Sequence, residues 1–447
     1  MLQFSAEYLS RRAVLRTSAM MGAGAAAATL PFASTAFAQG IAEEDAQARW
    51  PSVAAFMRGY VDREMVSGMV ATMGFGQDAP DILSAGTRTF DGSGAAGPDS
   101  IYRIYSMTKP ITGLATVMLI DDGLLSLDQP LADIIPAFAN MQVQKQYDGP
   151  ITRDNLEPAR RPITIRHLLT HTAGLGYSII QQGPINAAYR QRGIVPGQIS
   201  NMAIAQEIFG GRPAASLADF AEGLAQLPLV YQPGERWSYS VSLDLLGRVI
   251  EIVSGQQFDA FLQDRILGPC GMTSTGFQVK RGDADRLTGN YFVMAGIPIP
   301  IDLPRSSVYL HKPAFPFGGA GLVSTGRDYD RFLQMLAGYG EIEGKRVASE
   351  TAVRLATSNL FPETLASNGG FETGGRSFGF GAGGLVGTGD TEGLFGWFGA
   401  AGTVGLVNMK WGLRHNLMTQ YMPAETYQVQ QQFPLMVAQD AAGLMLS

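Results

Sequence analysis

The chain has little of the material that several classes of protein need. It contains one cysteine, Cys270, in 447 residues, which excludes an internal disulfide and favours a buried structural thiol. Of its four histidines only His167 and His171 lie close together, one helical turn apart on an expected helix. No third ligand and no H-E-x-x-H pattern accompanies them. We therefore expect a structural role for this pair and no metal or other cofactor.

Charge and long apolar runs are also scarce. Charged residues make up 16% of the chain and the formal net charge is −6, so the basic footprint of a nucleic-acid-binding protein is missing. After the first forty residues no stretch is apolar for long enough to span a bilayer. We therefore expect neither nucleic acid nor, in the mature form, a membrane among the partners.

The N-terminus has the pattern of an export signal. Arg11 and Arg12 precede an apolar, alanine-rich run over residues 19–32, and a small-x-small sequence ends at Ala38. The twin arginine is typical of the bacterial route that exports folded proteins. The apolar run is too short, and its side chains are too small, for a membrane anchor. We expect removal of residues 1–38 after Ala38 and a periplasmic or secreted protein.

Hydrophobic residues account for 46% of the chain, enough for a large core in one or two domains. The order of patterns is a helix and strands, a mostly helical middle, a glycine-rich run of short strands over 376–420, and a final helix. We predict an α/β domain formed by residues 39–128 and 291–447, with a helical domain of residues 129–290 inserted.

Local patterns predict several elements of these domains. We expect a helix over 44–65, a strand pair over 67–76 and 81–90, and a helix that begins near Thr164 and closes at Gly174. Residues 379–384 match G-x-G-x-x-G. The residues that follow are turn-like rather than helical, which argues against dinucleotide binding.

A serine and a lysine stand at a strand-to-helix transition in I-Y-S-M-T-K-P, residues 104–110. Ser106 would lie at a helix N-terminus with its backbone N–H free, and Lys109 one turn along on the same face. A lysine can activate such a hydroxyl when it is neutral, and burial disfavours its charged form. An N-cap serine before an exposed lysine would give the same tetrapeptide. However, lysine is scarce and Ser106 is the only serine with a lysine at this spacing.

Two further segments carry candidate chemistry. Tyr239 follows a Pro-Gly turn and precedes a long apolar helix, where it could pass a proton between nucleophile and leaving group, or only pack on Leu245 or Leu246. Residues 397–400 are expected at the end of a strand. One backbone N–H there could stabilise a developing oxyanion, although an ordinary glycine-rich hairpin gives the same pattern.

Taken together, four segments resemble the serine β-lactamase-like superfamily, which includes class C β-lactamases, D-alanyl-D-alanine carboxypeptidases and family VIII carboxylesterases. They are S-M-T-K (106–109), I-T-I-R-H-L-L-T-H-T-A-G-L (163–175), Y-S-V before L-L-G-R-V-I-E (239–251), and G-W-F-G-A-A-G-T (396–403). The resemblance runs from about residue 45 to the C-terminus. It implies a β-lactamase/transpeptidase-like fold, α/β plus all-α, in which helices flank an antiparallel sheet and a helical domain is inserted.

The resemblance also implies roles for particular residues. Ser106 would be the nucleophile and Lys109 its base, and Tyr239 would share in proton transfer. The backbone N–H groups of Ser106 and Ala400 would form the oxyanion hole. No G-x-S-x-G elbow occurs in the chain, so a Ser-His-Asp α/β-hydrolase is not expected.

Departures from the family pattern bear on the substrate. Val241 stands where lactamases and peptidases of this type have the asparagine of Y-x-N, and Trp397 stands where they have the lysine of K-T-G. Loss of the cation favours a neutral, partly apolar substrate. The W-x-G sequence that ends at Gly399 resembles family VIII esterases. We expect short-chain, neutral esters as small-molecule substrates, with Tyr177 as a further candidate in the acyl pocket.

Other functions fit parts of the same pattern. A β-lactamase, a D-amino-acid peptidase or an acyltransferase would share the fold, and a non-catalytic penicillin-binding-like module would keep the fold without the chemistry. The sequence leaves the natural substrate, its stereochemistry and the oligomeric state open.

Overall fold

The computed structural model describes residues 44–203, 205–206, 211–366, 370–373 and 376–446. The expected export signal lies outside these residues. Within them, none of the helices combines the length and the apolar character that crossing a membrane requires.

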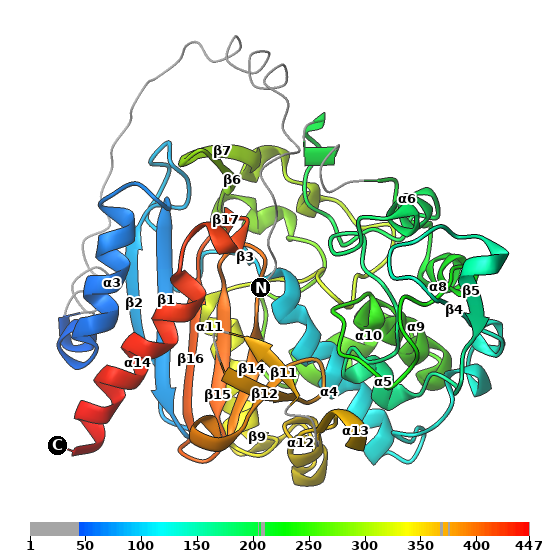
Figure 1. Ribbon diagram of the computed structural model, residues 1–447. Coiled ribbons are helices and arrows are strands. Elements are labelled where there is room, and N and C mark those ends of the chain that lie inside the picture. Colours follow the sequence, from blue (N-terminus) through cyan, green and yellow to red (C-terminus); the bar gives the residue numbers. More distant parts are fainter. Residues whose placement is uncertain (1–43, 204, 207–210, 367–369, 374–375, 447) are drawn as a thin grey trace.

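The centre of the fold is an eight-stranded sheet in the order β11-β12-β13-β14-β15-β16-β1-β2, with every pair antiparallel (Figure 1). Its strands are β1 (Gly68–Phe75), β2 (Asp81–Gly86), β11 (Phe371–Thr373), β12 (Arg376–Phe380), β13 (Leu385–Gly387), β14 (Leu394–Phe398), β15 (Val404–Asn408) and β16 (Leu413–Met418). Strand β1 pairs with β16, Val70 opposite Met418, so the sheet joins the two ends of the chain. The strand pair expected after residue 66 and the strands expected over 376–420 are both present.

Helices cover both faces of this sheet. Helices α3 (Pro51–Val61) and α14 (Val429–Leu446) pack together on one face, and α11 (Gly326–Ala337) lies on the other (Figure 1). The helix expected over 44–65 is interrupted at Trp50, because α3 begins at a proline, whose ring suits the first helical position. Trp50 is fully buried and its indole N–H donates to Asp81 Oδ2 at 2.6 Å, which ties this entry to β2.

The remaining helices lie mostly beside the other end of the sheet (Figure 1). They are α4 (Thr108–Asp121), α5 (Ile165–Leu169), α6 (Pro184–Gln191), α8 (Leu217–Ala225), α9 (Ser242–Ser254), α10 (Phe258–Leu262), α12 (Glu350–Ala356) and α13 (Glu363–Ala366). Short strands complete the fold: β3 (Tyr102–Arg103) with β8 (Val323–Ser324), β4 (Gln142–Gln144) with β5 (Leu156–Pro158), β9 (Glu341–Ile342) with β10 (Lys345–Arg346), and β6 (Asn290–Met294) with β7 (Ile297–Asp302) and β17 (Tyr421–Met422). Helix α4 packs on α9 and is buried along nearly its whole length, which makes it the central helix of the core.

One helix ends earlier than expected. Thr164 caps α5 as predicted, because its side chain accepts from His167 N–H and His167 Nδ1 accepts from Thr164 N–H. The helix ends at Leu169 and not at Gly174, since Thr170 Oγ1 donates back to Arg166 O and His171 turns the chain with φ +55°. The prediction that His167 and His171 lie one turn apart on this helix was therefore wrong.

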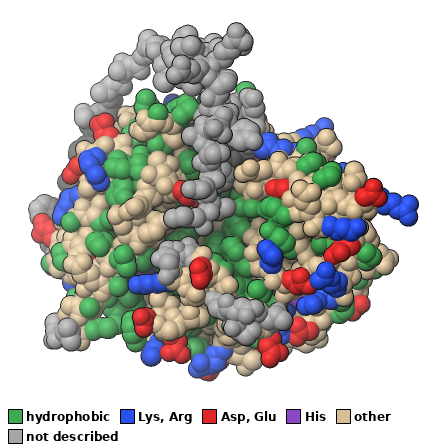
Figure 2. Space-filling model, viewed as in Figure 1, with side chains coloured by type: hydrophobic (Ala, Val, Ile, Leu, Met, Phe, Trp, Pro, Cys, Tyr) green, Lys and Arg blue, Asp and Glu red, His purple; other side chains and the backbone are tan. Residues whose placement is uncertain are grey.

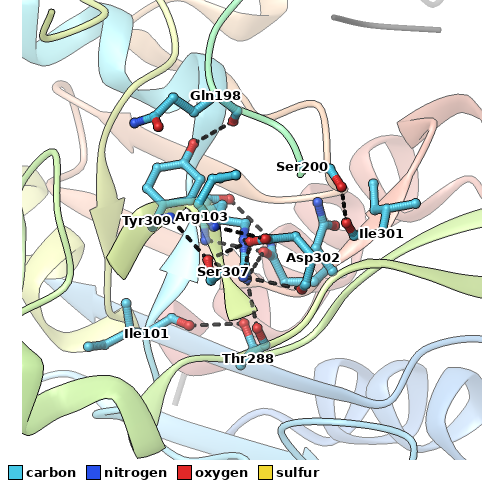
Figure 3. Close-up of polar contacts among 12 residues, drawn as sticks. Ile101, Arg103, Gln198, Ser200, Thr288, Ile301, Asp302, Ser307 and Tyr309 are labelled. Carbon is cyan, nitrogen blue, oxygen red and sulfur yellow. Dashed lines mark hydrogen bonds and ion pairs between the residues drawn. The ribbon is translucent and has the colours of Figure 1, made fainter. Parts of the chain in front are cut away.

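A buried arginine anchors the segment that leads into Ser106. The strand expected before Ser106 is only the two-residue β3, whose Arg103 is fully buried. Its guanidinium donates to Asp302 Oδ2 and to Thr288 O, both at 2.7 Å, and to Ser307 Oγ at 3.2 Å, with the ring of Tyr309 beside it (Figure 3). This group ties β3 to the end of β7.

Replacing Arg103 by methionine is expected to lower the free energy of unfolding by about 3–5 kcal/mol, because it leaves the Asp302 carboxylate buried without its cation. Urea unfolding measures the loss. The control is Arg327→Met, which removes an ion pair to Asp99 whose side chains are 49% and 59% exposed and should cost less than about 1 kcal/mol. Equal losses in the two variants would contradict this account of the buried pair.

Candidate active site

Ser106 is presented by a sharp turn at the start of α4. Residues Tyr105–Met107 form a 3₁₀ turn, and α4 begins at Thr108. Tyr105 has φ +42°, a left-handed conformation that is uncommon for a residue with a side chain. The buried Tyr105 hydroxyl accepts from Asn290 Nδ2 at 2.8 Å, which holds the turn in place. Ser106 itself is half-buried, so a ligand can reach it.

Lys109 stands in the first turn of α4, directly after the 3₁₀ turn that carries Ser106. Its Nζ is 3.0 Å from Ser106 Oγ and donates to Gly319 O at 2.7 Å. The side chain is 0% exposed, so the amine is shielded from bulk water. The structure therefore joins a reachable hydroxyl to a buried amine, as the spacing of the two residues predicted.

Tyr239 and Trp397 meet above this amine. Lys109 Nζ lies 4.5 Å from the centre of the Tyr239 ring, and the Tyr239 hydroxyl accepts from Trp397 Nε1 at 3.1 Å. Tyr239 comes from the loop before α9 and Trp397 from β14, 158 residues apart. The face of the phenol ring lies over the amine, while the hydroxyl points to the indole.

The two segments predicted to form an oxyanion hole lie against each other. Strand β14 packs on the 3₁₀ turn that carries Ser106. A Cβ atom added to Gly399 would lie 2.6 Å from Ile104 O, so only a glycine allows the backbones to approach this closely. Ala400 follows directly and packs in an apolar cluster with Tyr105. Ala400 and Ser106 therefore belong to adjacent stretches of backbone.

The two remaining predicted substrate residues are more deeply placed. Tyr177 is 2% exposed, with its ring 5.8 Å from Lys109 Nζ and 5.5 Å from the Tyr239 ring. Burial raises the pKa of the Tyr177 phenol well above its ordinary value, and the charge of Asp244 adds to this, so the phenol stays neutral. Val241 is fully buried beside α9, and its N–H donates to Gly176 O at 3.2 Å. In this structure its side chain therefore offers no surface to a ligand, whereas Tyr239 and Trp397 remain partly exposed.

His171 supports the loop that carries Tyr239. Its ring lies 4.8 Å from the Tyr239 ring, and its Nδ1 accepts from Ser240 N–H at 3.2 Å and lies 2.9 Å from Ser240 Oγ. Burial, and then the charge of Lys109, lower the pKa of His171 well below its ordinary value, so the imidazole is neutral. No group of three or more metal-binding side chains occurs in the described ranges.

A buried carboxylate, Asp244, also lies at the site, and the sequence reasoning missed it. It stands in the first turn of α9, is 1% exposed, and its Oδ1 accepts from Gly319 N–H at 2.8 Å. Burial raises the pKa of Asp244 to about 6, although the charge of Lys109 acts in the opposite direction. A single acid inside the apolar helix sequence S-L-D-L-L-G was the available signal, because carboxylates are almost never buried without a partner.

The glycine-rich segment at residues 379–384 packs against α4. A Cβ on Gly383 would lie 2.4 Å from Lys109 O, and a Cβ on Gly113 would lie 2.1 Å from Ala382 O. Residues Leu385–Gly387 form β13, and a short 3₁₀ turn follows at Gly389–Thr391. The turn-like character expected here therefore holds only after β13, and no α-helix directly follows the glycines. These glycines let the chain touch the first two turns of α4 and so help to hold Lys109.

Comparisons with known proteins agree with this fold. The Beta-lactamase family model matches residues 53–430. Esterase EstB of Burkholderia gladioli is 30% identical over 355 residues, which cover 72% of this chain and 77% of that protein. Protein Rv1367c of Mycobacterium tuberculosis is 35% identical over 371 residues, 78% of this chain and 84% of that protein. The chain therefore belongs to the beta-lactamase family.

Solved structures show the same fold. EstCE1, described as a hydrolase with promiscuous acyltransferase activity, superposes with a TM-score of 0.68 at 23% identity, over 90% of this chain and 99% of that chain. A LovD9 mutant of simvastatin synthase from Aspergillus terreus gives a TM-score of 0.68 at 21% identity, over 88% and 99%. The predicted β-lactamase/transpeptidase-like fold is confirmed, and the esterases among the relatives support a serine hydrolase.

Proposed function

We propose that this protein is a serine hydrolase that cleaves neutral carboxylic esters through an acyl-enzyme on Ser106. The observation that carries the proposal is the 3.0 Å distance between Ser106 Oγ and the fully buried Nζ of Lys109. A nucleophile and a base at hydrogen-bond distance are what covalent acyl transfer requires. The names of two relatives support it, esterase EstB and the lovastatin esterase of Penicillium rubens, which is 30% identical over 315 residues.

The proposed reaction has two steps. Lys109, as the neutral amine, takes the proton of Ser106, and the alkoxide attacks the ester carbonyl carbon. The backbone N–H groups of Ser106 and Ala400 hold the negative oxygen of the tetrahedral intermediate. The alcohol leaves with the proton that Lys109 took. Water then attacks the acyl-enzyme, gives its proton to Lys109, and frees the acid and the Ser106 hydroxyl, while the Tyr239 ring covers the amine.

Aromatic side chains around Trp397 favour a neutral substrate. The Trp397 ring lies 5.2 Å from Phe380, 5.8 Å from Tyr239 and 6.2 Å from Phe371, and Trp237 stacks on Phe371 at 4.7 Å. Figure 2 shows one face of the molecule, on which hydrophobic side chains form patches with charged side chains of both signs scattered between them. Aromatic rings attract apolar groups but leave a carboxylate without a partner.

A fluorophosphonate probe and two chromogenic substrates test this function. We expect the probe to label Ser106, and kcat/KM for a short-chain nitrophenyl ester to exceed that for a chromogenic cephalosporin by about 100-fold or more, because Trp397 stands in place of the lysine that would bind a lactam carboxylate. Fast lactam turnover without ester cleavage would overturn the proposal. Folded protein that the probe leaves unlabelled would point instead to a non-catalytic module.

We also propose that the protein acts after export, because a twin arginine, an apolar run and Ala38 stand in the order of a cleavable signal. In a bacterial host that has the twin-arginine pathway, the mature protein should begin at Gln39 and leave the cytoplasm. Mass spectrometry of the intact protein measures this. Changing Arg11 and Arg12 to lysine should retain the precursor in the cytoplasm, and export that continues unchanged would refute the twin-arginine route.

A further inference from the structure

A pair of glycines bridges the helix that carries the nucleophile and the helix that follows Tyr239. In the peptide unit between Gly318 and Gly319, the carbonyl accepts from Thr112 Oγ1 on α4 at 2.8 Å. The N–H of the same unit donates to Asp244 Oδ1 on α9 at 2.8 Å. The next carbonyl, Gly319 O, accepts from Lys109 Nζ at 2.7 Å. The orientation of this bridge therefore decides where the acceptor for Lys109 stands.

The bridge fits closely against the first turn of α9. A Cβ on Gly318 would lie 2.4 Å from Leu243 O, and a Cβ on Gly319 would lie 2.6 Å from Asp244 Oδ2. A methyl group at Gly318 would require the backbone to shift, and one at Gly319 would require the Asp244 side chain to move. Because the packing around Gly318 and Gly319 is this close, we expect a substitution at Asp244 to displace the Gly319 backbone.

Asp244 is costly to keep at this place. It is 1% exposed, and its Oδ2 has no hydrogen-bond partner in the described part of the chain. Burial disfavours the charged carboxylate and raises the pKa of Asp244 to about 6. Keeping the group ionised at neutral pH therefore costs stability. An apolar side chain of similar volume would avoid that cost, so the carboxylate needs a use other than stability.

Granting the proposed function, we propose that Asp244 is a positioning residue for Lys109. It fixes Gly319 so that the Gly319 carbonyl takes one N–H of the amine and leaves the lone pair of the amine directed at Ser106 Oγ. A neutral amine has two N–H groups and one lone pair, so a fixed acceptor on one N–H limits where the lone pair can point. Asp244 acts through the Gly319 backbone and needs no contact with the substrate.

Three variants and a matched control test this role. Asp244→Leu removes the acceptor for Gly319 N–H and should lower kcat for a nitrophenyl ester by about 100-fold, with KM within about threefold, since a small misplacement of catalytic groups has effects of this size. Asp244→Asn keeps an acceptor oxygen and should stay within about tenfold of wild type. Thr112→Val frees the other end of the same peptide unit and should lower kcat about fivefold.

The control is Thr116→Val. Thr116 is fully buried one turn further along α4, but its hydroxyl bonds only to Thr112 O of its own helix among the described contacts. Its kcat should equal that of wild type. Each rate is taken per folded molecule, with folding checked by circular dichroism and the melting temperature.

The outcomes separate this inference from the proposed function. Suppose that the wild type is labelled at Ser106 and cleaves esters, but a folded Asp244→Leu variant has the same kcat. This result would leave the proposed function intact and overturn the role of Asp244. Equal losses for leucine and asparagine would also overturn it, since the charge and not the acceptor would then matter. If the leucine variant does not fold, a Thr112→Val rate equal to that of Thr116→Val overturns it. Wild type without labelling or ester cleavage overturns both proposals.

Discussion

Replacing Ser106 by alanine is expected to lower kcat for a nitrophenyl ester by about 10⁶-fold, the size seen when the nucleophile of a serine hydrolase is removed. Binding groups and oxyanion donors remain, but no atom can form the acyl-enzyme. The fold should survive, because the half-buried hydroxyl contributes a single described hydrogen bond, the one to Lys109. The melting temperature should stay within a few degrees of wild type. Stopped assays at high enzyme concentration measure the residual rate.

The matched control for this variant is Ser84→Ala. Ser84 is also partly buried, but it lies on the edge strand β2, four strands away from β14 in the sheet, and its replacement should leave kcat unchanged. The fluorophosphonate should label the control and leave Ser106→Ala unmodified. A Ser106→Ala protein that retains wild-type turnover would remove the acyl-enzyme from the mechanism.

The Ser106–Lys109 pair could be predicted from the sequence because both residues share one turn of helix. Residues three apart on a helix lie on one face, so their spacing alone sets their separation. The sheet was predictable for a related reason, since its strands in residues 376–420 are short β-like runs within a glycine-rich stretch. The family model and the similar solved structures confirm the fold that these patterns indicated.

The rest of the site depends on contacts that no local pattern encodes. Lys109 meets Gly319 across 210 residues, and Asp244 meets it across 75. Helix α5 ends at Leu169 because His171 turns back to reach Ser240, and the propensities of residues 164–174 do not contain that contact. Tertiary contacts here override local preference.

The position of Val241, a predicted substrate-binding residue, could likewise not be predicted from the sequence. Its position in the family motif suggested a place beside the ligand, yet its side chain is fully buried beside the first turn of α9. Loss of an amide at that position therefore also changes the packing of the core. Trp397, in contrast, is partly exposed, and its indole N–H donates a hydrogen bond to the Tyr239 hydroxyl. A lysine at this position would bring a positive charge to the site instead of an aromatic ring.

Replacing Lys109 by methionine is expected to lower kcat by about 10⁴-fold with little change in KM, because the substrate keeps its binding groups while Ser106 loses its base. Methionine has a similar length and fills buried space well, so gross collapse of the site is not expected. Lys312→Met, at an exposed position, is the control and should behave as wild type. A Lys109→Met enzyme within tenfold of wild type would show that another group takes the proton.

The same variant should change how stability depends on pH, through Asp244. Burial holds the pKa of Asp244 at about 6, above its ordinary value, and Lys109 in its protonated form lowers that pKa. An acid whose pKa is raised by folding binds its proton more tightly in the folded state. Its contribution to stability therefore increases as the pH falls through about 6 and is lost as the pH rises. Without Lys109 the pKa of Asp244 rises further and the gain begins at higher pH. The melting temperature should therefore increase more between pH 8 and pH 5 in Lys109→Met than in wild type, and equal increases would mean that the two charges do not interact.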